Sequence, residues 1–385
     1  MKVAVTTLAF CVAALLALGL VMLYSSSMAM VDKHTHSELG THYLRTQLEW
    51  GALGFILCVA ATILDYQWLN KFAWPVYAFA LVLLAAVFVP HIGHSSHGAH
   101  RWIKQFGFQF QPSEFAKLAL IVILAWYCDL SRRQMRTFKR GVLYPGAIAA
   151  LILGLIFIEP DRGTTILLAA VAGSMLLAAG VRWIHLLWPV LAGLAGLAVS
   201  ILRDPMRMNR ILAWQHPQEH LNDAARQAHQ AMMGLGSGGW FGVGLGNGMQ
   251  KYGYLSEIQT DFILANIGEE LGLLATLLII VAFMVIAICG VYIALNSREP
   301  FGCMLALGIT LLIGLQAAIN IGVVTSALPN KGLPLPFISA GGTSLVVMLA
   351  GVGVLFSVAR HAPAREKISK PVVEADDNPF AARAT

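Results

Sequence analysis

Apolar runs long enough to cross a membrane recur from one end of this chain to the other, and they limit its possible folds more than any other feature. An α-helix needs about 20 apolar residues to span the hydrocarbon core of a bilayer. Charged residues make up only 12% of the 385 residues, whereas soluble domains carry about 25%. So few charges cannot cover a soluble surface of this size. We therefore predict an all-α membrane protein with the bilayer as its main solvent.

We predict about ten transmembrane helices, with large extracytoplasmic loops, in one polytopic membrane domain over residues 1–364. The spans are expected near 3–28, 46–65, 72–90, 113–129, 142–158, 163–181, 183–202, 262–295, 301–326 and 342–360. The first run is longer than the core of a cleavable signal peptide and lacks a small-residue cleavage site, so we expect it to be retained. The 5 cysteines form no CxxC pair. We interpret them as small buried residues rather than disulfide or metal ligands.

Basic residues in short loops predict the orientation of the spans. The loop after the fourth span carries Arg132, Arg133, Arg136, Lys139 and Arg140, and the segment after the tenth span carries Arg360, Arg365, Lys367 and Lys370. Ten spans put both groups on the side of the N-terminus, which is then cytoplasmic in a bacterial inner membrane. The loops 91–112, 203–260 and 327–341 face outward, and 365–385 is expected to be a disordered cytoplasmic tail. The formal charge of +6 is explained by these loops, without nucleic acid as a partner.

Charged residues within or beside the spans are candidates for function because their insertion costs about 2.5–3.5 kcal/mol each. Glu114 and Lys117 are three residues apart near the start of the fourth span, so they can pair on one helix face. They could form the charged wall of an outer cavity or a buried pair that only joins helices. Asp161 lies in the short turn Glu159-Pro-Asp-Arg162, which could equally be a solvated turn.

Asp261 at the start of the eighth span is the strongest catalytic candidate in the sequence. A helix N-terminus favours a negative charge, which a general base or a cation ligand must carry. Glu269 lies eight residues further on, about 12 Å deeper in a regular helix, and within reach of the same cavity. The alternative is an aspartate that caps the helix without chemistry.

Two segments rich in glycine or proline interrupt the helical pattern. Residues 234–248 contain Trp240 and Phe241 among glycines, without a phosphate-loop signature, and are expected to form an irregular segment at the membrane interface. Residues 328–344 carry prolines and glycines that exclude a regular helix, so this stretch must pack on protein or line a cavity. Histidines recur every third residue over 91–100. We favour a flexible solvated loop there over a metal site.

Taken in order along the chain, these motifs resemble the SEDS (shape, elongation, division and sporulation) proteins, the FtsW/RodA group of peptidoglycan glycosyltransferases. The matching pieces are Gln111-Pro-Ser-Glu-Phe-Ala-Lys117, Glu159-Pro-Asp161 with Gly163-Thr164, Trp240-Phe-Gly-Val-Gly-Leu-Gly-Asn-Gly248, Thr260-Asp-Phe262 with Ile267-Gly-Glu-Glu-Leu-Gly272, and Leu328-Pro-Asn-Lys-Gly-Leu-Pro-Leu-Pro-Phe-Ile-Ser339. Each piece is weak alone, but five in family order are specific. Lys331 before Gly332, and Gly238-Gly-Trp-Phe241, are more similar to the division branch than to the elongation branch.

The resemblance implies an enzyme that polymerises lipid II on the outer face of the membrane for septal wall synthesis. It implies that Asp261 is the essential aspartate and that Arg101, Glu114 and Lys117 line the cavity. It also implies a class B penicillin-binding protein as partner, with other divisome membrane proteins. The segment Ser256-Glu-Ile-Gln-Thr-Asp261 departs from the family pattern by lacking its proline and histidine.

The chemistry of glycosyl transfer assigns roles to these residues as a hypothesis. Asp261 would act as general base or as ligand of a divalent cation such as Mg²⁺ or Mn²⁺, and no organic cofactor is expected. Arg101, Lys104 and Lys117 are candidates to contact the lipid pyrophosphate. Asp161, Glu269 and Lys331 are further cavity candidates. A lipid II flippase and a non-catalytic division scaffold remain alternative functions.

Overall fold

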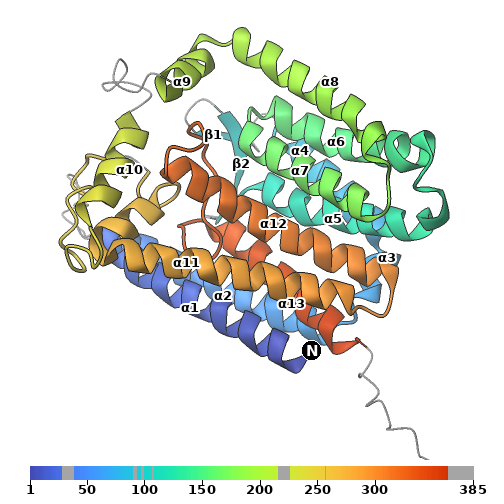
Figure 1. The fold of residues 1–385 in the computed structure, drawn as a ribbon, viewed down its shortest axis with the longest axis horizontal. Coiled ribbons are helices and arrows are strands. Elements are labelled where there is room, and N and C mark those ends of the chain that lie inside the picture. The colour runs from blue at the N-terminus through green and yellow to red at the C-terminus, as the bar shows by residue number, and fades with distance from the viewer. Residues whose placement is uncertain are drawn as a thin grey trace, which may run out of the picture.

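The computed structural model describes residues 1–27, 39–89, 93–96, 99–105, 108–215, 226–255 and 257–362. The fold is a bundle of long helices that run in roughly the same direction, with shorter elements gathered at one end (Figure 1).

Ten helices coincide with the ten predicted spans. They are α1 (Lys2–Ser27), α2 (Leu39–Ile63), α4 (Ala73–Ala86), α5 (Pro112–Leu130), α6 (Tyr144–Ile158), α7 (Arg162–Ala178), α8 (Trp183–Leu202), α11 (Ile263–Leu295), α12 (Pro300–Val324) and α13 (Gly342–Arg360). Within the described part of the chain, seven segments are long and apolar enough to cross a membrane, and α4 and α7 are shorter apolar helices. The remaining helix, α5, carries Glu114, Lys117 and Asp129.

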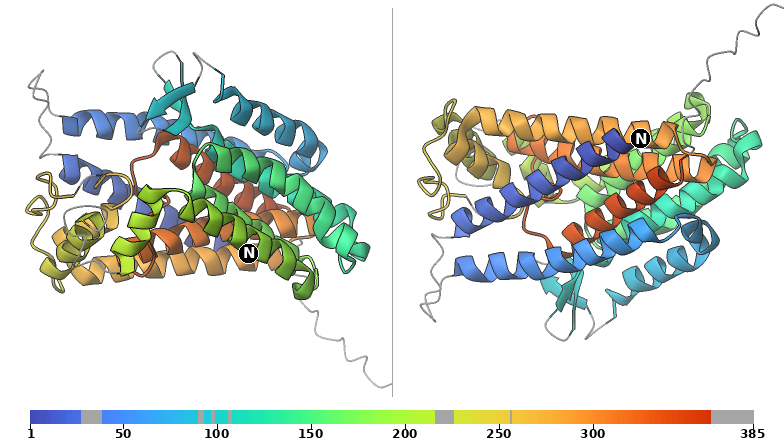
Figure 2. Two further views of the ribbon diagram at one scale, coloured as in Figure 1. Left: turned by 90° about the horizontal axis from the view of Figure 1, so that it is seen from above. Right: turned by 90° about the horizontal axis from the view of Figure 1, so that it is seen from below.

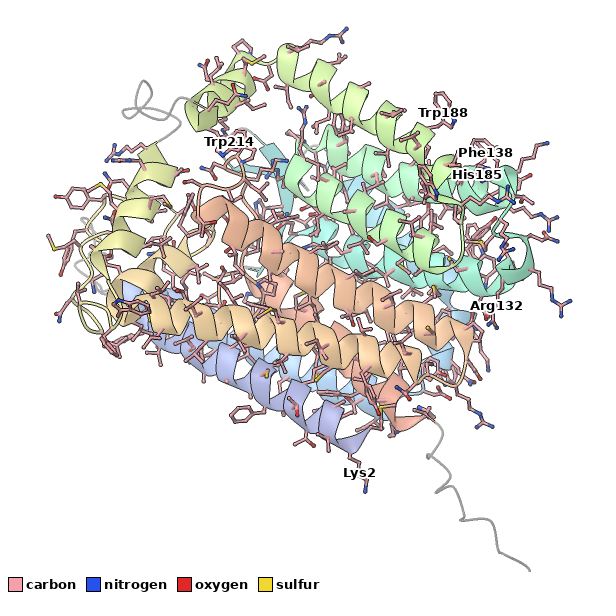
Figure 3. All side chains as sticks on the ribbon, in the orientation of Figure 1. Lys2, Arg132, Phe138, His185, Trp188 and Trp214 are labelled. Atoms are coloured by element: carbon pink, nitrogen blue, oxygen red, sulfur yellow. The ribbon has the colours of Figure 1, made fainter. Side chains whose placement is uncertain are left out.

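Helix α5 forms the centre of the bundle. Most of its 19 residues are buried, and it packs against α4, α6, α7, α12 and α13. Around it, α2 packs on α13, and α1 packs on α2 and α11; Figure 2 shows α1 and α2 side by side. Helix α8 lies at the edge, with Leu186 as its single buried residue, and its Trp188 points away from the bundle (Figure 3). A helix that is apolar on its outer face suits contact with lipid.

The N-terminus and the basic loop lie at one end of the bundle, as the distribution of arginine and lysine predicted. Lys2 and Arg132 both lie toward this end in Figure 3. The end of α13 joins them, because the Arg360 guanidinium donates to the carbonyl of Ile63 at the end of α2 over 2.8 Å. We call this the basic end. The loop between α5 and α6 contains short helical turns at Arg132–Gln134 and Lys139–Leu143, and α3 (Gln67–Lys71) joins α2 to α4.

The opposite end holds the elements that the sequence did not predict in detail. Strands β1 (Gly93–Ser96), β2 (Ala99–Gln105) and β3 (Phe108–Phe110) form an antiparallel sheet in that order. The prediction of a flexible loop over 91–100 was therefore wrong for the residues of these strands, and the all-α bundle carries a small sheet. Within the predicted loop 203–260, the structure describes α9 (Pro205–Gln215) and α10 (Arg226–Ser237). The tail 365–385 lies outside the described residues.

Helix α11 is interrupted at Gly272, which has φ 80° and ψ −176°. The glycine-rich segment enters the break. The amides of Val243 and Gly244 donate to the carbonyls of Glu269 and Glu270 over 3.0 Å. These carbonyls would otherwise bond within the helix, so the segment satisfies backbone groups that the break leaves open. Trp240 and Phe241 are largely exposed. The prediction of an irregular segment over 234–248 is confirmed from Gly238 onward but was wrong for 234–237, which form the end of α10.

Gly272→Ala is expected to destabilise the protein by at least about 1–3 kcal/mol, because this backbone conformation is nearly exclusive to glycine. A Cβ at this position would also lie 2.4 Å from the amide nitrogen of Gly242. Thermal unfolding of the purified protein in detergent measures the effect. Gly173→Ala in α7 is the matched control, because a Cβ there meets nothing within 4 Å. Equal melting temperatures for the two variants would contradict the prediction.

Candidate active site

Asp261 lies two residues before α11, in a turn that it helps to close. Its amide donates to the carbonyl of Glu257 over 3.1 Å. Phe262, not Asp261, is the N-cap residue of α11, and no side chain caps this helix end. The alternative of a purely capping aspartate was therefore wrong. The Asp261 side chain is partly exposed and accepts no hydrogen bond from the described residues, so its carboxylate is available to a ligand.

Asn320 holds the backbone around Asp261 in place. Its side-chain amide, buried within α12, donates to the carbonyl of Asp261 and to the carbonyl of Leu333, both over 2.8 Å. A Cβ on Gly332 would lie 2.8 Å from the Asp261 carboxylate, so a larger residue at this position would have to displace that side chain. Sequence reasoning missed Asn320. The available signal was a carboxamide inside a run that is otherwise apolar.

The turn between α6 and α7 brings further charges beside Asp261. Asp161 caps α7, where its carboxylate accepts from the amide of Thr164 over 3.2 Å and from the Thr164 hydroxyl over 2.9 Å. Arg101 on β2 donates to the carbonyls of Glu159 and Pro160 over 3.2 and 2.5 Å. The sheet therefore positions an arginine on the turn that carries Asp161. The alternative of a solvated turn was wrong for Glu159 and Asp161, which are both buried.

Burial and charged neighbours together shift the pKa of Asp261. The pKa of this carboxyl is raised to about 7, with burial as the largest cause, the carboxylates of Glu257 and Asp161 adding to the increase and the Arg101 guanidinium opposing it. Burial and repulsion therefore act against the helix dipole, which was expected to keep Asp261 ionised. A carboxylate whose pKa lies near neutrality is suited to accept a proton at the working pH.

Glu159 is a second buried carboxyl in this region. It is fully inaccessible, and its oxygens accept no hydrogen bond from the described residues. Burial raises its pKa to about 8, with Asp161 adding to the increase and Arg101 opposing it. Glu159 is therefore expected to be mostly protonated at neutral pH. The sequence placed this residue in the turn but gave no sign of its burial.

Two further lysine candidates come from the loop after α12 and from β2. Lys331 lies partly buried in the loop between α12 and α13, and burial lowers its pKa. A Cβ built on its neighbour Gly332 would lie 2.8 Å from the Asp261 carboxylate, so the backbone of Lys331 belongs to the same surroundings. Lys104 pairs through its backbone with Gln109 in the sheet. The side chain of Lys104 lies outside the described residues.

Glu114 and Lys117 form a pair inside the bundle. The Lys117 ammonium lies 2.8 Å from the Glu114 carboxylate, and the two side chains are 0% and 4% exposed. Lys117 also donates to the Gln316 side chain over 3.0 Å, and Gln316 donates to the carbonyl of Pro334 over 2.9 Å. The network joins α5, α12 and the loop after α12. In this structure Lys117 is sealed from solvent, so the pair holds helices and loop together.

Glu269 anchors the glycine-rich segment, away from the charges that act on Asp261. Its carboxylate accepts from the amide of Met249 over 2.8 Å and from the amide of Gln250 over 3.2 Å. The adjacent Glu270 binds the Lys251 ammonium over 3.1 Å and the Ser25 hydroxyl over 2.5 Å. These carboxylates therefore fix the segment on α11 and α1. That Glu269 and Asp261 line one cavity stays a prediction.

The part of the chain that the structure describes contains no group of three histidine, cysteine, aspartate or glutamate side chains able to hold a metal ion. The donors near Asp261 therefore do not fit a metal held by protein ligands alone. Mg²⁺ in phosphate-transferring enzymes is usually held by one or two carboxylates together with substrate phosphates.

The chain matches known proteins over nearly its whole length. A family model described as "Cell cycle protein", FTSW_RODA_SPOVE, matches residues 6–364. A protein of Geobacter metallireducens named "Probable peptidoglycan glycosyltransferase FtsW" is 40% identical over 345 residues, which are 90% of this chain and 92% of that relative. The "Stage V sporulation protein E" of Bacillus subtilis is 36% identical over 347 residues, covering 90% of this chain and 94% of its own.

Solved structures share the fold. The crystal structure of the rod shape determining protein RodA of Thermus thermophilus matches with a TM-score of 0.69 and 27% identity, over 93% of this chain and 97% of that one. A structure described as "Structural coordination of polymerization and crosslinking by a peptidoglycan synthase complex" matches with a TM-score of 0.76 and 25% identity, covering 92% and 96% of the two chains.

Proposed function

This chain belongs to the FtsW, RodA and SpoVE family of cell cycle proteins, and from that premise we propose that it is a peptidoglycan glycosyltransferase that polymerises lipid II. The observation that carries the proposal is the position of Asp261, a partly exposed carboxylate with its backbone fixed by Asn320. The naming of similar proteins as FtsW favours septal wall synthesis during cell division.

The reaction joins the hydroxyl of an acceptor sugar to the anomeric carbon of a lipid-pyrophosphate donor. As the new carbon–oxygen bond forms, the bond from the anomeric carbon to the pyrophosphate breaks, and its electron pair leaves with the pyrophosphate. The hydroxyl is a poor nucleophile until its proton is removed. Asp261 accepts this proton, a contribution of about 10²–10⁴-fold to the rate.

The leaving pyrophosphate needs positive charge. Arg101 acts electrostatically on Asp261, and Lys331 precedes Gly332, where a Cβ would lie 2.8 Å from the Asp261 carboxylate. We assign these two cations to the pyrophosphate in preference to Lys117, which is sealed within the bundle. A divalent cation would be held by Asp261 together with the pyrophosphate oxygens, where it would neutralise developing negative charge.

The proposed orientation puts Asp261 on the outer face of the bacterial inner membrane. The basic end, with Lys2 and Arg132, is cytoplasmic by the positive-inside rule, and α11 runs from Asp261 to the basic end. Since a structurally similar assembly is described as coordinating polymerization and crosslinking, we assign a class B penicillin-binding protein as the crosslinking partner, with other divisome proteins around it.

Incubation with labelled lipid II tests the proposal directly. The purified full-length protein, alone and with a class B penicillin-binding protein, is expected to convert lipid II into glycan chains that a gel resolves as a ladder. A matched sample without protein gives the background. If no ladder forms under either condition while the protein moves lipid II between leaflets of a vesicle, the flippase alternative replaces the polymerase.

The rate of polymerisation is expected to rise with pH through about 7 and then to level off, because only the deprotonated form of Asp261 accepts a proton. The Arg101 guanidinium lowers the pKa of Asp261, so Arg101→Gln should move this rise to higher pH. Rates at saturating lipid II between pH 5.5 and 9 measure the midpoint. Arg133→Gln, an exposed arginine at the basic end, is the control and should leave the midpoint unchanged. A midpoint that Arg101→Gln leaves in place would contradict the assignment.

A further inference from the structure

A cavity at the basic end has no part in the chemistry proposed above. It has a volume of about 330 Å³ and lies where α5, α7 and α11 end and α12 begins. This volume is at the lower end of the range of about 300–1,000 Å³ for ligand pockets. Figure 3 shows Arg132, one of its lining residues, at this end of the bundle, remote from α10 and the glycine-rich segment.

Two arginines make the cavity attractive to a negatively charged ligand. Arg132 and Arg298 both line it, and neither guanidinium donates a hydrogen bond or forms an ion pair with another described residue. The lining also contains Glu299, but its carboxylate accepts from the Gln67 side chain over 2.8 Å. A guanidinium presents five donors in a plane that matches phosphate oxygens, so two unused guanidinium groups favour a phosphate.

Apart from Ser297, whose hydroxyl donates to the carbonyl of Glu299, the rest of the lining is apolar. Ala178 at the end of α7, Leu295 at the end of α11, and Met304 in the first turns of α12 contribute side chains without charge. The cavity therefore joins a cationic rim to an apolar floor at the end of membrane-spanning helices. Arg132 is shared with a second cavity, whose lining holds Arg133 and Arg140 and one carboxylate, Asp129, and therefore carries a net positive charge.

We propose that this cavity binds the headgroup of an anionic glycerophospholipid of the cytoplasmic leaflet. The phosphate lies between Arg132 and Arg298, and the start of an acyl chain lies on the apolar floor. The inference rests on the orientation given under the proposed function, which places the basic end in the cytoplasm. Basic pockets between helix ends on that side of a membrane are suited to acidic lipid headgroups.

A simpler explanation is that these arginines only enrich the cytoplasmic side in positive charge, as in many membrane proteins. That explanation predicts diffuse attraction, in which each basic residue of the loop contributes about equally. A site predicts that two particular residues dominate. Arg136 and Lys139 provide the comparison, because both are exposed in the same loop and line neither cavity.

The experiment compares two double variants of equal charge. Full-length protein in detergent is titrated with phosphatidylglycerol or phosphatidylcholine, and retained lipid is counted by native mass spectrometry. We expect one phosphatidylglycerol to be retained by the wild type and by Arg136→Gln/Lys139→Gln, and its affinity to fall at least tenfold in Arg132→Gln/Arg298→Gln. Equal losses in the two double variants, equal retention of phosphatidylcholine, or full displacement by millimolar inorganic phosphate would overturn the proposal.

Two further measurements keep the result interpretable. Arg132→Lys/Arg298→Lys keeps the charge but loses the planar guanidinium, so it should bind with intermediate affinity, and it replaces the glutamine variant if that variant does not fold. Polymerisation of lipid II is measured on the same samples. If the Arg132→Gln/Arg298→Gln variant loses the bound phospholipid but still polymerises lipid II, the result supports the site. If the wild-type protein retains the phospholipid but makes no glycan, only the proposed function is disproved.

Discussion

Asp261→Asn is expected to lower the rate of lipid II polymerisation by at least about 10²-fold, because the variant loses the group that accepts the hydroxyl proton. The substitution keeps the shape of the side chain and leaves the backbone bond between the Asp261 carbonyl and Asn320 in place. Glycan formed from labelled lipid II, with and without the partner, gives the measurement. Product close to the wild-type amount would refute the assignment of Asp261 as base.

Two controls separate this chemical effect from damage to the fold. Glu257→Gln removes an exposed carboxylate that raises the pKa of Asp261, so it should keep activity and move the pH midpoint down. Stability gives the second control. The pKa of Asp261 in the folded protein is raised to about 7, so folding favours the protonated carboxyl. The folded protein therefore loses this contribution to its stability as pH rises through 7. Asp261→Asn should therefore melt at or above the wild-type temperature at pH 8.

Lys117→Met is expected to destabilise the protein by about 3–5 kcal/mol, because removing one partner of a buried ion pair leaves an uncompensated charge. The Glu114 carboxylate would remain inside the bundle with its strongest contact, at 2.8 Å, removed. Thermal unfolding in detergent measures the effect, together with polymerisation at a temperature at which the variant remains folded.

The double variant Glu114→Gln/Lys117→Met provides the control for this prediction. It removes both charges, so most of the lost stability should return, as is found when buried pairs are replaced by neutral side chains. If Lys117→Met keeps its melting temperature but loses polymerisation, the lysine contacts substrate and the structural role given to the pair is wrong. If the double variant is as unstable as Lys117→Met alone, the charge of Glu114 is not the cause.

The ten spans could be predicted because hydrophobic length is a local property of the sequence. The bilayer sets the number of residues needed, and each run of about 20 residues meets it independently of the others. The position of the basic loop at the same end of the bundle as the N-terminus was predictable for the same reason, since Arg132 and its neighbours lie within one short loop. The side of the membrane that this end faces stays a prediction. Asp261 could be singled out because a carboxylate is conspicuous at the start of a long apolar run.

The details of the site depend on contacts between distant segments, which a single sequence does not encode in a readable way. The burial of Glu159 depends on the small sheet, because Arg101 on β2 bonds the turn that carries it. Glycine at 272 was visible, but the break in α11 depends on the glycine-rich segment supplying its amides. Local reasoning treated Glu269 as part of a regular helix beside Asp261, and could not foresee its bonds to the amides of Met249 and Gln250.

The carboxamide of Asn320 has a mechanical consequence. One rigid planar group is tied to the main chain ahead of α11 and to the main chain after α12, with equal bond lengths of 2.8 Å. A shift of the backbone near Leu333 must then also move the backbone of Asp261, or break one of these two hydrogen bonds. In the proposed function, a contact that moves this loop would therefore also move the base.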